Sequence, residues 1–150
     1  MCPVRSDQSC VTRPTIAQLS SLSIMPSMKS KRETERDISQ AIIRFEKEFM
    51  GRGPLETKTY IVEDMILVRL KGVLTPAELK LAEAEERDRG RYLLKQVRQE
   101  LIQHGRPLLD AVVKEILGVD PISLHTDISA KTGERIIVFT LDNPPKFSDS

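Results

Sequence analysis

The sequence predicts one α+β domain in the order α-β-β-α-α-β-β, with a four-stranded antiparallel sheet and helices packed on one of its faces. Two observations support this fold class. Apolar residues recur every three or four positions in some segments and alternate in others, which are the periods of helices and strands. Capping residues, glycines and prolines separate those segments.

The chain has 150 residues, the size of one ordinary domain. We expect the domain to span residues 30–142, after a disordered tail over 1–29 and before a frayed tail over 143–150. The N-terminal tail is rich in Ser, Thr and Pro and shows no sustained period. A transit peptide, or a natural start at Met25 or Met28, are the other interpretations of this segment.

The domain is expected to begin with a helix after Ser30. Ser30 and Glu33 have the spacing of a capping box, in which each side chain accepts a hydrogen bond from a backbone N–H of the first turn. Gly51 can adopt the left-handed conformation that ends the helix. The apolar stripe comprises Ile38, Ala41, Ile42, Phe45 and Phe49, and the residues expected to face elsewhere are Arg36, Asp37, Arg44, Glu46 and Lys47.

A β-hairpin is predicted over residues 57–70, turning at the polar pair Glu63-Asp64. This turn sets Val62 opposite Met65. One face then carries Tyr60, Val62, Met65 and Leu67 with Lys58 and Arg69, and the other carries Thr57, Thr59, Ile61, Ile66, Val68 and Leu70. Both faces are substantially apolar, whereas an antiparallel sheet of a monomer usually shows water one polar face. We expect a loop, a helix or a second subunit to cover the second face, and we favour a homodimer.

Two further helices are predicted. The first begins at Thr75-Pro76-Ala77-Glu78, a capping box with proline at the first helical position. Its expected apolar stripe is Leu79, Ala82, Leu93, Val97 and Leu101, with an exposed charge run at 83–91. Gly105-Arg106-Pro107 is expected to break this helix, and the next helix to run over residues 107–117 before Gly118.

The last hairpin is predicted over residues 122–141, around the loop Ala130-Lys131-Thr132-Gly133. This loop sets Ile122, Leu124, Ile128, Ile137, Phe139 and Leu141 on one face, and Ser123, His125, Asp127, Ser129 and Glu134 on the other. The apolar face should meet the helices. The polar face should meet water or a ligand.

Composition excludes several classes of protein. Lys and Arg number 23 and Asp and Glu 22, so no global field attracts nucleic acid, and we expect no nucleic-acid partner. Both cysteines, Cys2 and Cys10, lie in the N-terminal tail, which excludes a disulfide framework and fits the cytosol. No apolar run reaches the length of a membrane span, so we expect a soluble cytoplasmic protein without direct membrane insertion, peripheral to a membrane only through a partner.

Four residues are candidates for ligand binding. Arg52 lies in the glycine loop Gly51-Arg52-Gly53-Pro54, where it would hold a carboxylate, phosphate or bicarbonate, or would simply be a solvated residue after a helix. His125 and Asp127 share one strand face and would form a proton-transfer pair or contribute metal ligands, or belong to a polar face in an interface or in solvent. Lys131 lies at a charged hairpin tip.

Complete catalytic or metal-binding motifs are missing from the sequence. No nucleophile with a paired base, zinc motif or dinucleotide fingerprint is visible. His104, the other histidine, is expected at a helix end rather than beside His125. We therefore expect no catalysis, no metal and no cofactor.

Three segments, FEKEFMGRGP, MILVRLKGVLTPAE and SLHTDISAKTGER, resemble the MpsC-like family, a domain of unknown function named after the Na+-translocating membrane-potential-generating system. The resemblance covers about residues 30–142. It implies a soluble accessory of a membrane complex tied to cation transport or inorganic-carbon uptake, and it carries over no catalytic residue. The family positions present are Gly51, Arg52, Gly53, Pro54, Arg106, Pro107, His125, Asp127, Lys131, Thr132 and Gly133.

Two functional hypotheses follow. The first is a non-enzymatic interaction module, dimeric, that docks on a membrane transport complex. The second is a sensor of an anion or small molecule, or an enzyme, that uses a polar site around Arg52, His125 and Asp127.

Overall fold

The structure is a computed structural model that describes residues 28–148, so nearly all of the predicted N-terminal tail lies outside the described residues. The elements are helix α3 (Lys31–Phe49), strands β1 (Glu56–Val62) and β2 (Met65–Lys71), helices α4 (Pro76–Glu83) and α5 (Arg87–Leu117), and strands β3 (Pro121–Ile128) and β4 (Arg135–Leu141). This is the predicted order.

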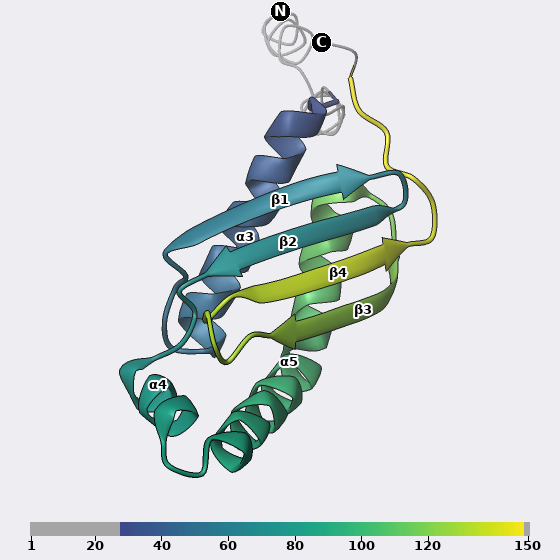
Figure 1. The fold of residues 1–150 in the computed structure, drawn as a ribbon. Coiled ribbons are helices and arrows are strands. Elements are labelled where there is room, and N and C mark those ends of the chain that lie inside the picture. The colour runs from purple at the N-terminus through teal and green to yellow at the C-terminus, as the bar shows by residue number, and fades with distance from the viewer. Residues whose placement is uncertain (1–27, 149–150) are drawn as a thin grey trace, which may run out of the picture.

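The four strands form one antiparallel sheet in the order β1-β2-β4-β3. Both predicted hairpins form, and the two hairpins join through β2 and β4. Helices α3 and α5 lie on the same side of the sheet (Figure 1). The predicted fold class is therefore confirmed, and the predicted pairing of Val62 with Met65 is also observed.

Helix α3 begins as its sequence predicts. The Glu33 N–H donates to Ser30 Oγ over 3.2 Å, and the Ser30 N–H donates to Glu33 Oε2 over 2.9 Å. The prediction that Glu46 faces away from the core is wrong, because Glu46 is fully buried. It lies four residues after Ile42 and eight after Ile38, so it continues the buried stripe of the helix.

The predicted helix break at Gly105-Arg106-Pro107 is also wrong. The chain leaves the helical conformation at residues 84–86, and α5 continues through Pro107. Instead of ending the helix, the proline lies in a helix that changes direction part-way along its length (Figure 1), as proline inside a helix generally causes. Packing against α3 and the sheet holds both parts of α5 in place.

Close helix packing depends on two glycines of α5. A Cβ on Gly90 would lie 2.1 Å from the carbonyl oxygen of Leu81 in α4, and a Cβ on Gly105 would lie 2.5 Å from the ring of Phe45 in α3. A side chain at either position would push a neighbouring helix away. These glycines therefore place α4 and α3 against α5.

The buried stripe of α5 lies one position later than predicted. Leu93 and Val97, expected in the core, are 40% and 53% exposed, whereas Leu94, Arg98 and Ile102 are buried. The charge of Arg98 concealed the buried stripe, because a sequence pattern treats arginine as a surface residue.

The core lies between the helices and one face of the sheet. Its buried apolar residues are Ile38, Ile42, Phe45, Ile61, Ile66, Val68, Leu70, Val73, Leu74, Ala82, Leu94, Ile102, Leu109, Val113, Ile128, Ile137, Phe139 and Leu141. After β4 the chain has no further helix or strand within the described residues, yet Phe147 packs against this core and the Ser148 N–H donates to the Lys29 carbonyl oxygen over 3.0 Å.

Candidate interaction face and buried charge cluster

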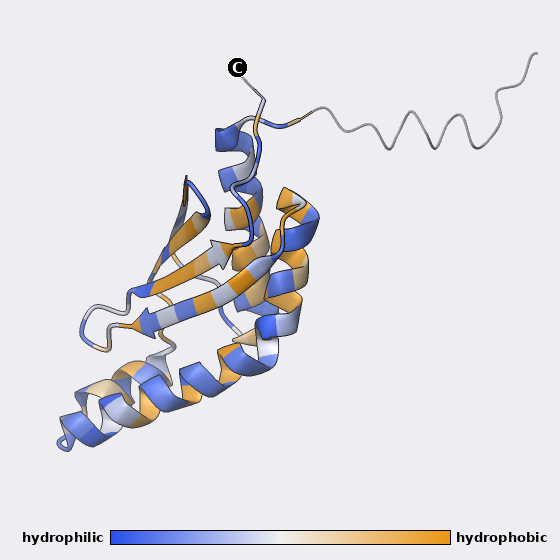
Figure 2. Ribbon diagram, turned by 90° about the vertical axis from the view of Figure 1, so that its right-hand side faces the viewer, coloured by the Kyte–Doolittle hydropathy of each residue, from blue (hydrophilic) through white to orange (hydrophobic). Residues whose placement is uncertain are grey.

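The face of the sheet turned away from α3 and α5 is apolar over three neighbouring strands. We call it the open face, because no described element packs on it. Figure 1 shows this face towards the viewer, with α3 and α5 behind the sheet, and Figure 2 shows hydrophobic segments, in orange, along the strands. Its apolar side chains are Tyr60, Val62, Met65, Leu67, Ile136 and Val138. Tyr60, Val62 and Met65 are 46%, 51% and 41% exposed, respectively.

The strand register arranges the open face in rows across the sheet. The middle row, read from β1 to β3, is Tyr60, Leu67, Val138 and His125. The row nearer the β1–β2 turn is Val62, Met65, Thr140 and Ser123. The row farther from that turn is Lys58, Arg69, Ile136 and Asp127. The apolar residues thus lie on β1, β2 and β4. The edge strand β3 contributes only polar residues to these rows, and Lys58, Arg69 and Thr140 are the polar residues of the other strands.

The predicted division of the second hairpin into an apolar face and a polar face holds for β3 from Ser123 onwards and not for β4. Strand β4 has apolar residues on both faces, since Ile136 and Val138 share the open face with the polar side chains of β3. Ile122, expected in the core, is 63% exposed. The pairing of β3 with β4 is irregular between Pro121 and Ser123, and this extra residue takes Ile122 out of the alternation.

Ion pairs border the open face away from the β1–β2 turn. Glu56 lies 3.3 Å from Lys58 Nζ and 3.2 Å from Lys71 Nζ, and Arg69 Nη2 lies 2.7 Å from Glu134 Oε2. Hydrogen bonds from Lys71 and Lys58 hold the pKa of Glu56 below its ordinary value. The open face therefore has a charged end and an apolar end.

The outer edge of β1 is engaged by α3. The Ile61 N–H donates to Glu35 Oε1 over 2.9 Å, and the hydroxyls of Ser39 and Thr59 are 2.7 Å apart. An unpaired edge strand would offer its backbone to another chain. Here Glu35 binds one backbone N–H of this edge, while Ser39 contacts the Thr59 side chain.

The covered side of the sheet contains a buried charge cluster that sequence reasoning missed. Glu46, Arg98 and Arg135 have exposed fractions of 0%, 2% and 1%. Arg135 Nη1 donates to Glu46 Oε1 over 3.2 Å, and Arg98 Nη1 lies 3.6 Å from Glu46 Oε2. Arg98 also donates to both carboxylate oxygens of Glu78, over 2.8 and 2.6 Å. Two arginines and two glutamates therefore balance in charge.

The cluster joins four elements. Glu46 comes from α3, Glu78 from α4, Arg98 from α5 and Arg135 from β4. Burial raises the pKa of Glu46, against the opposing attraction of the two guanidinium groups. Burial also acts to raise the pKa of Glu78, but hydrogen bonds from Arg98 and Thr75 hold that pKa below its ordinary value. The sequence positions of these residues could have revealed the cluster. Glu46 follows Ile42 by four residues on the buried side of α3, and Arg135 lies two residues before the buried Ile137, on the same face of β4.

The structure places the Arg52 guanidinium against a backbone carbonyl. Its Nη1 donates to the carbonyl oxygen of Leu74 over 3.1 Å, which ties the loop after α3 to the loop before α4. Within residues 28–148, no hydrogen bond or ion pair joins Arg52 to His125 or Asp127. Arg52 therefore has a structural contact.

His125 and Asp127 project from the open face of β3. His125 Nε2 lies 3.4 Å from Ser123 Oγ. Asp127 accepts from Lys95 Nζ over 3.1 and 3.2 Å and from the Ile128 N–H, and these bonds lower its pKa although burial opposes them. Lys131 is exposed at the β3–β4 turn. The described residues hold no group of three or more side chains suited to a metal ion.

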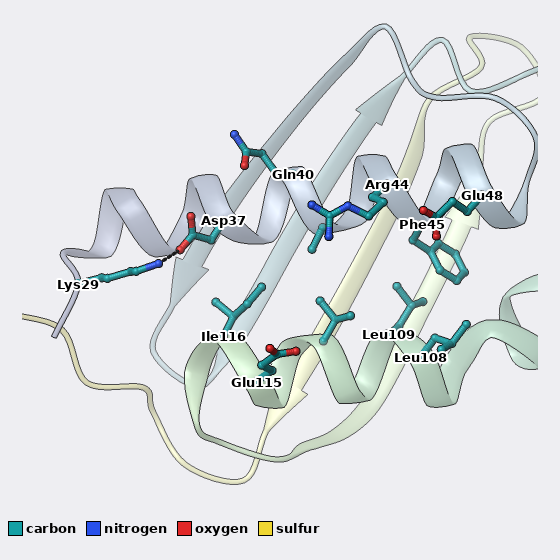
Figure 3. Close-up of a pocket in the computed structure, with 12 residues that line it drawn as sticks. Lys29, Asp37, Gln40, Arg44, Phe45, Glu48, Leu108, Leu109, Glu115 and Ile116 are labelled. Atoms are coloured by element: carbon teal, nitrogen blue, oxygen red, sulfur yellow. Dashed lines mark hydrogen bonds and ion pairs between the residues drawn. The ribbon is translucent and has the colours of Figure 1, made fainter. Parts of the chain in front are cut away.

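A groove of about 380 Å³ lies between α3 and α5 (Figure 3). Helix α3 contributes Asp37, Gln40 and Arg44 to it, and α5 contributes Leu109 and Ile116. The polar residues carry both signs and come mainly from one helix. The groove therefore lacks a convergent set of groups for binding one charged ligand.

The fold and its contacts define a small α+β module with an exposed apolar sheet face and a neutral, buried charge cluster. The chain belongs to the family described as Na+-translocating membrane potential-generating system (MpsC), which matches residues 30–143. No helix within the described residues is both long enough and apolar enough to cross a membrane.

Two curated relatives come from Bacillus subtilis (strain 168). The chain is 44% identical over 115 residues to the uncharacterized protein YbcI, covering 77% of this chain and 90% of YbcI. It is 28% identical over 108 residues to the uncharacterized protein YrhF, covering 71% of this chain and 85% of YrhF. No solved structure matches this chain.

Proposed function

We propose that this protein is a non-catalytic interaction module that works as a homodimer through its open face. The observation that carries the proposal is the uncovered patch of six apolar side chains on β1, β2 and β4. A contiguous exposed apolar patch usually marks a binding surface. Tyrosine and methionine, both present here, are enriched at interfaces.

A second copy is the occupant that this surface fits best. The patch lies on a sheet face, and two sheets can stack face to face at about 10 Å with their side chains interdigitating. A partner strand added at β1 would find one backbone N–H of that edge already bound by Glu35. Burying the patches of two copies against each other removes both from water.

We further propose that the dimer is a cytoplasmic accessory of a membrane system that transports cations. The support is the description of the family, which refers to a Na+-translocating, membrane-potential-generating system. Attachment to the membrane would then run through a protein partner. Catalysis is not part of the proposal, because Arg52 is bound to a backbone carbonyl while His125 and Asp127 lie on a sheet face.

The oligomeric state tests the dimer. Light scattering after size-exclusion chromatography should give the mass of two chains for the wild type and of one chain for Leu67→Asp. The matched control is Leu108→Asp, because Leu108 is 57% exposed on α5 and outside the open face. It should remain dimeric. A wild type that is monomeric at high concentration would refute the dimer.

Co-purification tests the membrane partner. Chromosomally tagged protein, crosslinked in cells and extracted from native membranes in mild detergent, should bring down a subunit of a cation transporter. A strain with tagged Leu67→Asp shows whether this contact needs the dimer. Recovery without any transporter subunit would overturn the accessory role.

A further inference from the structure

We infer that the two copies pack open face to open face about a two-fold axis that runs parallel to the strands, between β2 and β4, with Lys58 of each copy opposite Asp127 of the other. This inference rests on the proposed homodimer and specifies its geometry. Two gradients of residue type on the open face select this arrangement.

The first gradient runs along the strands. The end near the β1–β2 turn carries Val62 and Met65, and the opposite end carries Glu56 and Lys71. A two-fold axis perpendicular to the strands would stack the apolar end of one copy on the charged end of the other. The charged groups at that end would then lose water against apolar side chains. An axis parallel to the strands instead stacks each row on the same row of the other copy, which places Leu67 of each copy over Val138 of the other.

The second gradient runs across the strands. Lys58 on β1 and Asp127 on β3 belong to the same row, at opposite edges of the sheet, and so do Tyr60 and His125. A two-fold axis parallel to the strands places β1 of one copy over β3 of the other. Each lysine then meets an aspartate and each tyrosine a histidine, and symmetry repeats both contacts.

Asp127 and Lys58 can each form a further hydrogen bond to the other copy. The Asp127 side chain is 75% exposed although Lys95 binds it, and a carboxylate can accept about four hydrogen bonds. Lys58 is 58% exposed in its side chain, with one neighbour at 3.3 Å, and its ammonium has three donors. The flexible lysine side chain can span the offset that twist introduces between stacked sheets.

This geometry gives His125 and Asp127 a role that needs no ligand. They form the polar border of a subunit interface, on the strand that lacks apolar residues on its open face. Rim charges of this kind select the register and orientation of an interface more than they add affinity. The open face is thereby complementary to itself.

Charge exchange tests the arrangement. Lys58→Glu and Asp127→Lys should each raise the dimer dissociation constant by about tenfold, because each sets like charges opposite one another. The double variant Lys58→Glu/Asp127→Lys should return the constant to within about threefold of the wild type. Lys131→Glu is the control, because Lys131 lies on the hairpin tip outside the open face. Analytical ultracentrifugation measures the constants.

The outcomes separate the two proposals. A monomeric wild type refutes the homodimer itself. A wild-type dimer that Leu67→Asp dissociates, but in which the charge exchange restores nothing, refutes this geometry and leaves the homodimer standing. Cysteine crosslinking gives a second measurement, in a Cys2→Ser/Cys10→Ser background. A bis-maleimide with a spacer of about 10 Å, the spacing of stacked sheets, should link Tyr60→Cys of one copy to His125→Cys of the other when both are present in each chain, and should not link copies that carry Tyr60→Cys alone.

Discussion

The two faces of the sheet reverse the usual distribution of charge and apolar surface. The covered face packs against α3 and α5, yet its core includes the fully buried Glu46 and the almost fully buried Arg98 and Arg135. The open face has no described element on it, yet it presents Leu67 and Val138 on its central strands. Three charged residues therefore lie within a largely aliphatic core, and several aliphatic residues lie on the open face.

The two faces show that the contacts a side chain makes, and not its polarity alone, decide whether it can be buried or exposed. An isolated buried charge is very costly, but a neutral set of guanidinium and carboxylate groups with hydrogen bonds is tolerated. Exposed apolar side chains cost little in a monomer and become favourable when a second surface covers them. The buried charges link the elements of one copy. We propose that the apolar open face serves association between copies.

The largest effect is expected from removing the carboxylate at the centre of the charge cluster. Glu46→Ala leaves Arg135 without its buried counter-ion, and breaking such a pair costs about 3–5 kcal/mol of the free energy of unfolding. Urea unfolding followed by circular dichroism measures this loss. The control is Glu48→Ala, which removes an exposed carboxylate from the same helix. A loss no larger than that of the control would show that the cluster does not stabilise the fold.

A double variant sharpens the same point. If the cost arises from an unpaired charge, Glu46→Leu/Arg135→Met should be more stable than Glu46→Leu alone, because neither charge is left behind. An additive loss would instead assign the cost to packing.

A smaller loss is expected from filling the space where α3 approaches α5. Gly105→Ala places a Cβ about 2.5 Å from the Phe45 ring, and overpacking of a core typically costs about 1–3 kcal/mol. Phe45→Leu removes the ring atoms that clash. The double variant Gly105→Ala/Phe45→Leu should therefore lose less than the sum of the single losses. Strict additivity would show that the two helices do not depend on this contact.

Local patterns predicted the elements of the fold, but not the parts that depend on tertiary contacts. The capping boxes and the hairpin at Glu63-Asp64 follow from neighbouring residues, and the structure contains them. The charge cluster depends on residues up to 89 positions apart, and its charged side chains argue for surface positions when taken singly. Pro107 does not end the helix, because buried residues on both sides of it, Ile102 and Leu109, pack in the core.

The candidate site divides in the same way. The sequence located the apolar second face of the first hairpin, because alternation within β1 and β2 is local. It did not extend that face over Ile136 and Val138, since this requires knowing that β4 lies beside β2. Arg52, His125 and Asp127 were grouped by chemical type, and only the structure shows that Arg52 binds the Leu74 carbonyl oxygen.

Acid titration should distinguish the two glutamates of the cluster. The pKa of Glu78 is lowered in the folded protein, so its stabilising contribution is present above its ordinary pKa of 4.5 and is lost as the pH falls through the folded value. The pKa of Glu46 is raised, so the pH-dependent part of its contribution is present below 4.5 and is lost as the pH rises through the folded value, while its hydrogen bond from Arg135 remains.

Glutamine variants test these opposite dependences of stability on pH. The destabilisation caused by Glu78→Gln should shrink as the pH falls below 4.5, whereas that caused by Glu46→Gln should shrink as the pH rises above 4.5. Urea unfolding across the acid range measures both. Parallel pH profiles of the two variants would contradict the assignment.

The smallest effect on the fold is expected from the open face. Ile66 and Leu67 are neighbours on β2 with side chains on opposite faces, which makes them a matched pair. Ile66→Ser should cost several kcal/mol, because Ile66 is fully buried, whereas Leu67→Ser should cost the monomer only about 1 kcal/mol, because Leu67 is partly exposed. The two faces would then differ as the structure indicates.

Protein concentration shows what Leu67 does instead. A homodimer is stabilised by mass action, so the melting temperature of the wild type should rise with protein concentration. Leu67→Ser should abolish that rise while lowering the dilute-limit melting temperature much less than Ile66→Ser does. Differential scanning calorimetry over a wide concentration range measures both quantities. If Leu67→Ser instead lowers the dilute-limit value as much as Ile66→Ser does, the open face belongs to the core of the monomer, and association must use another surface.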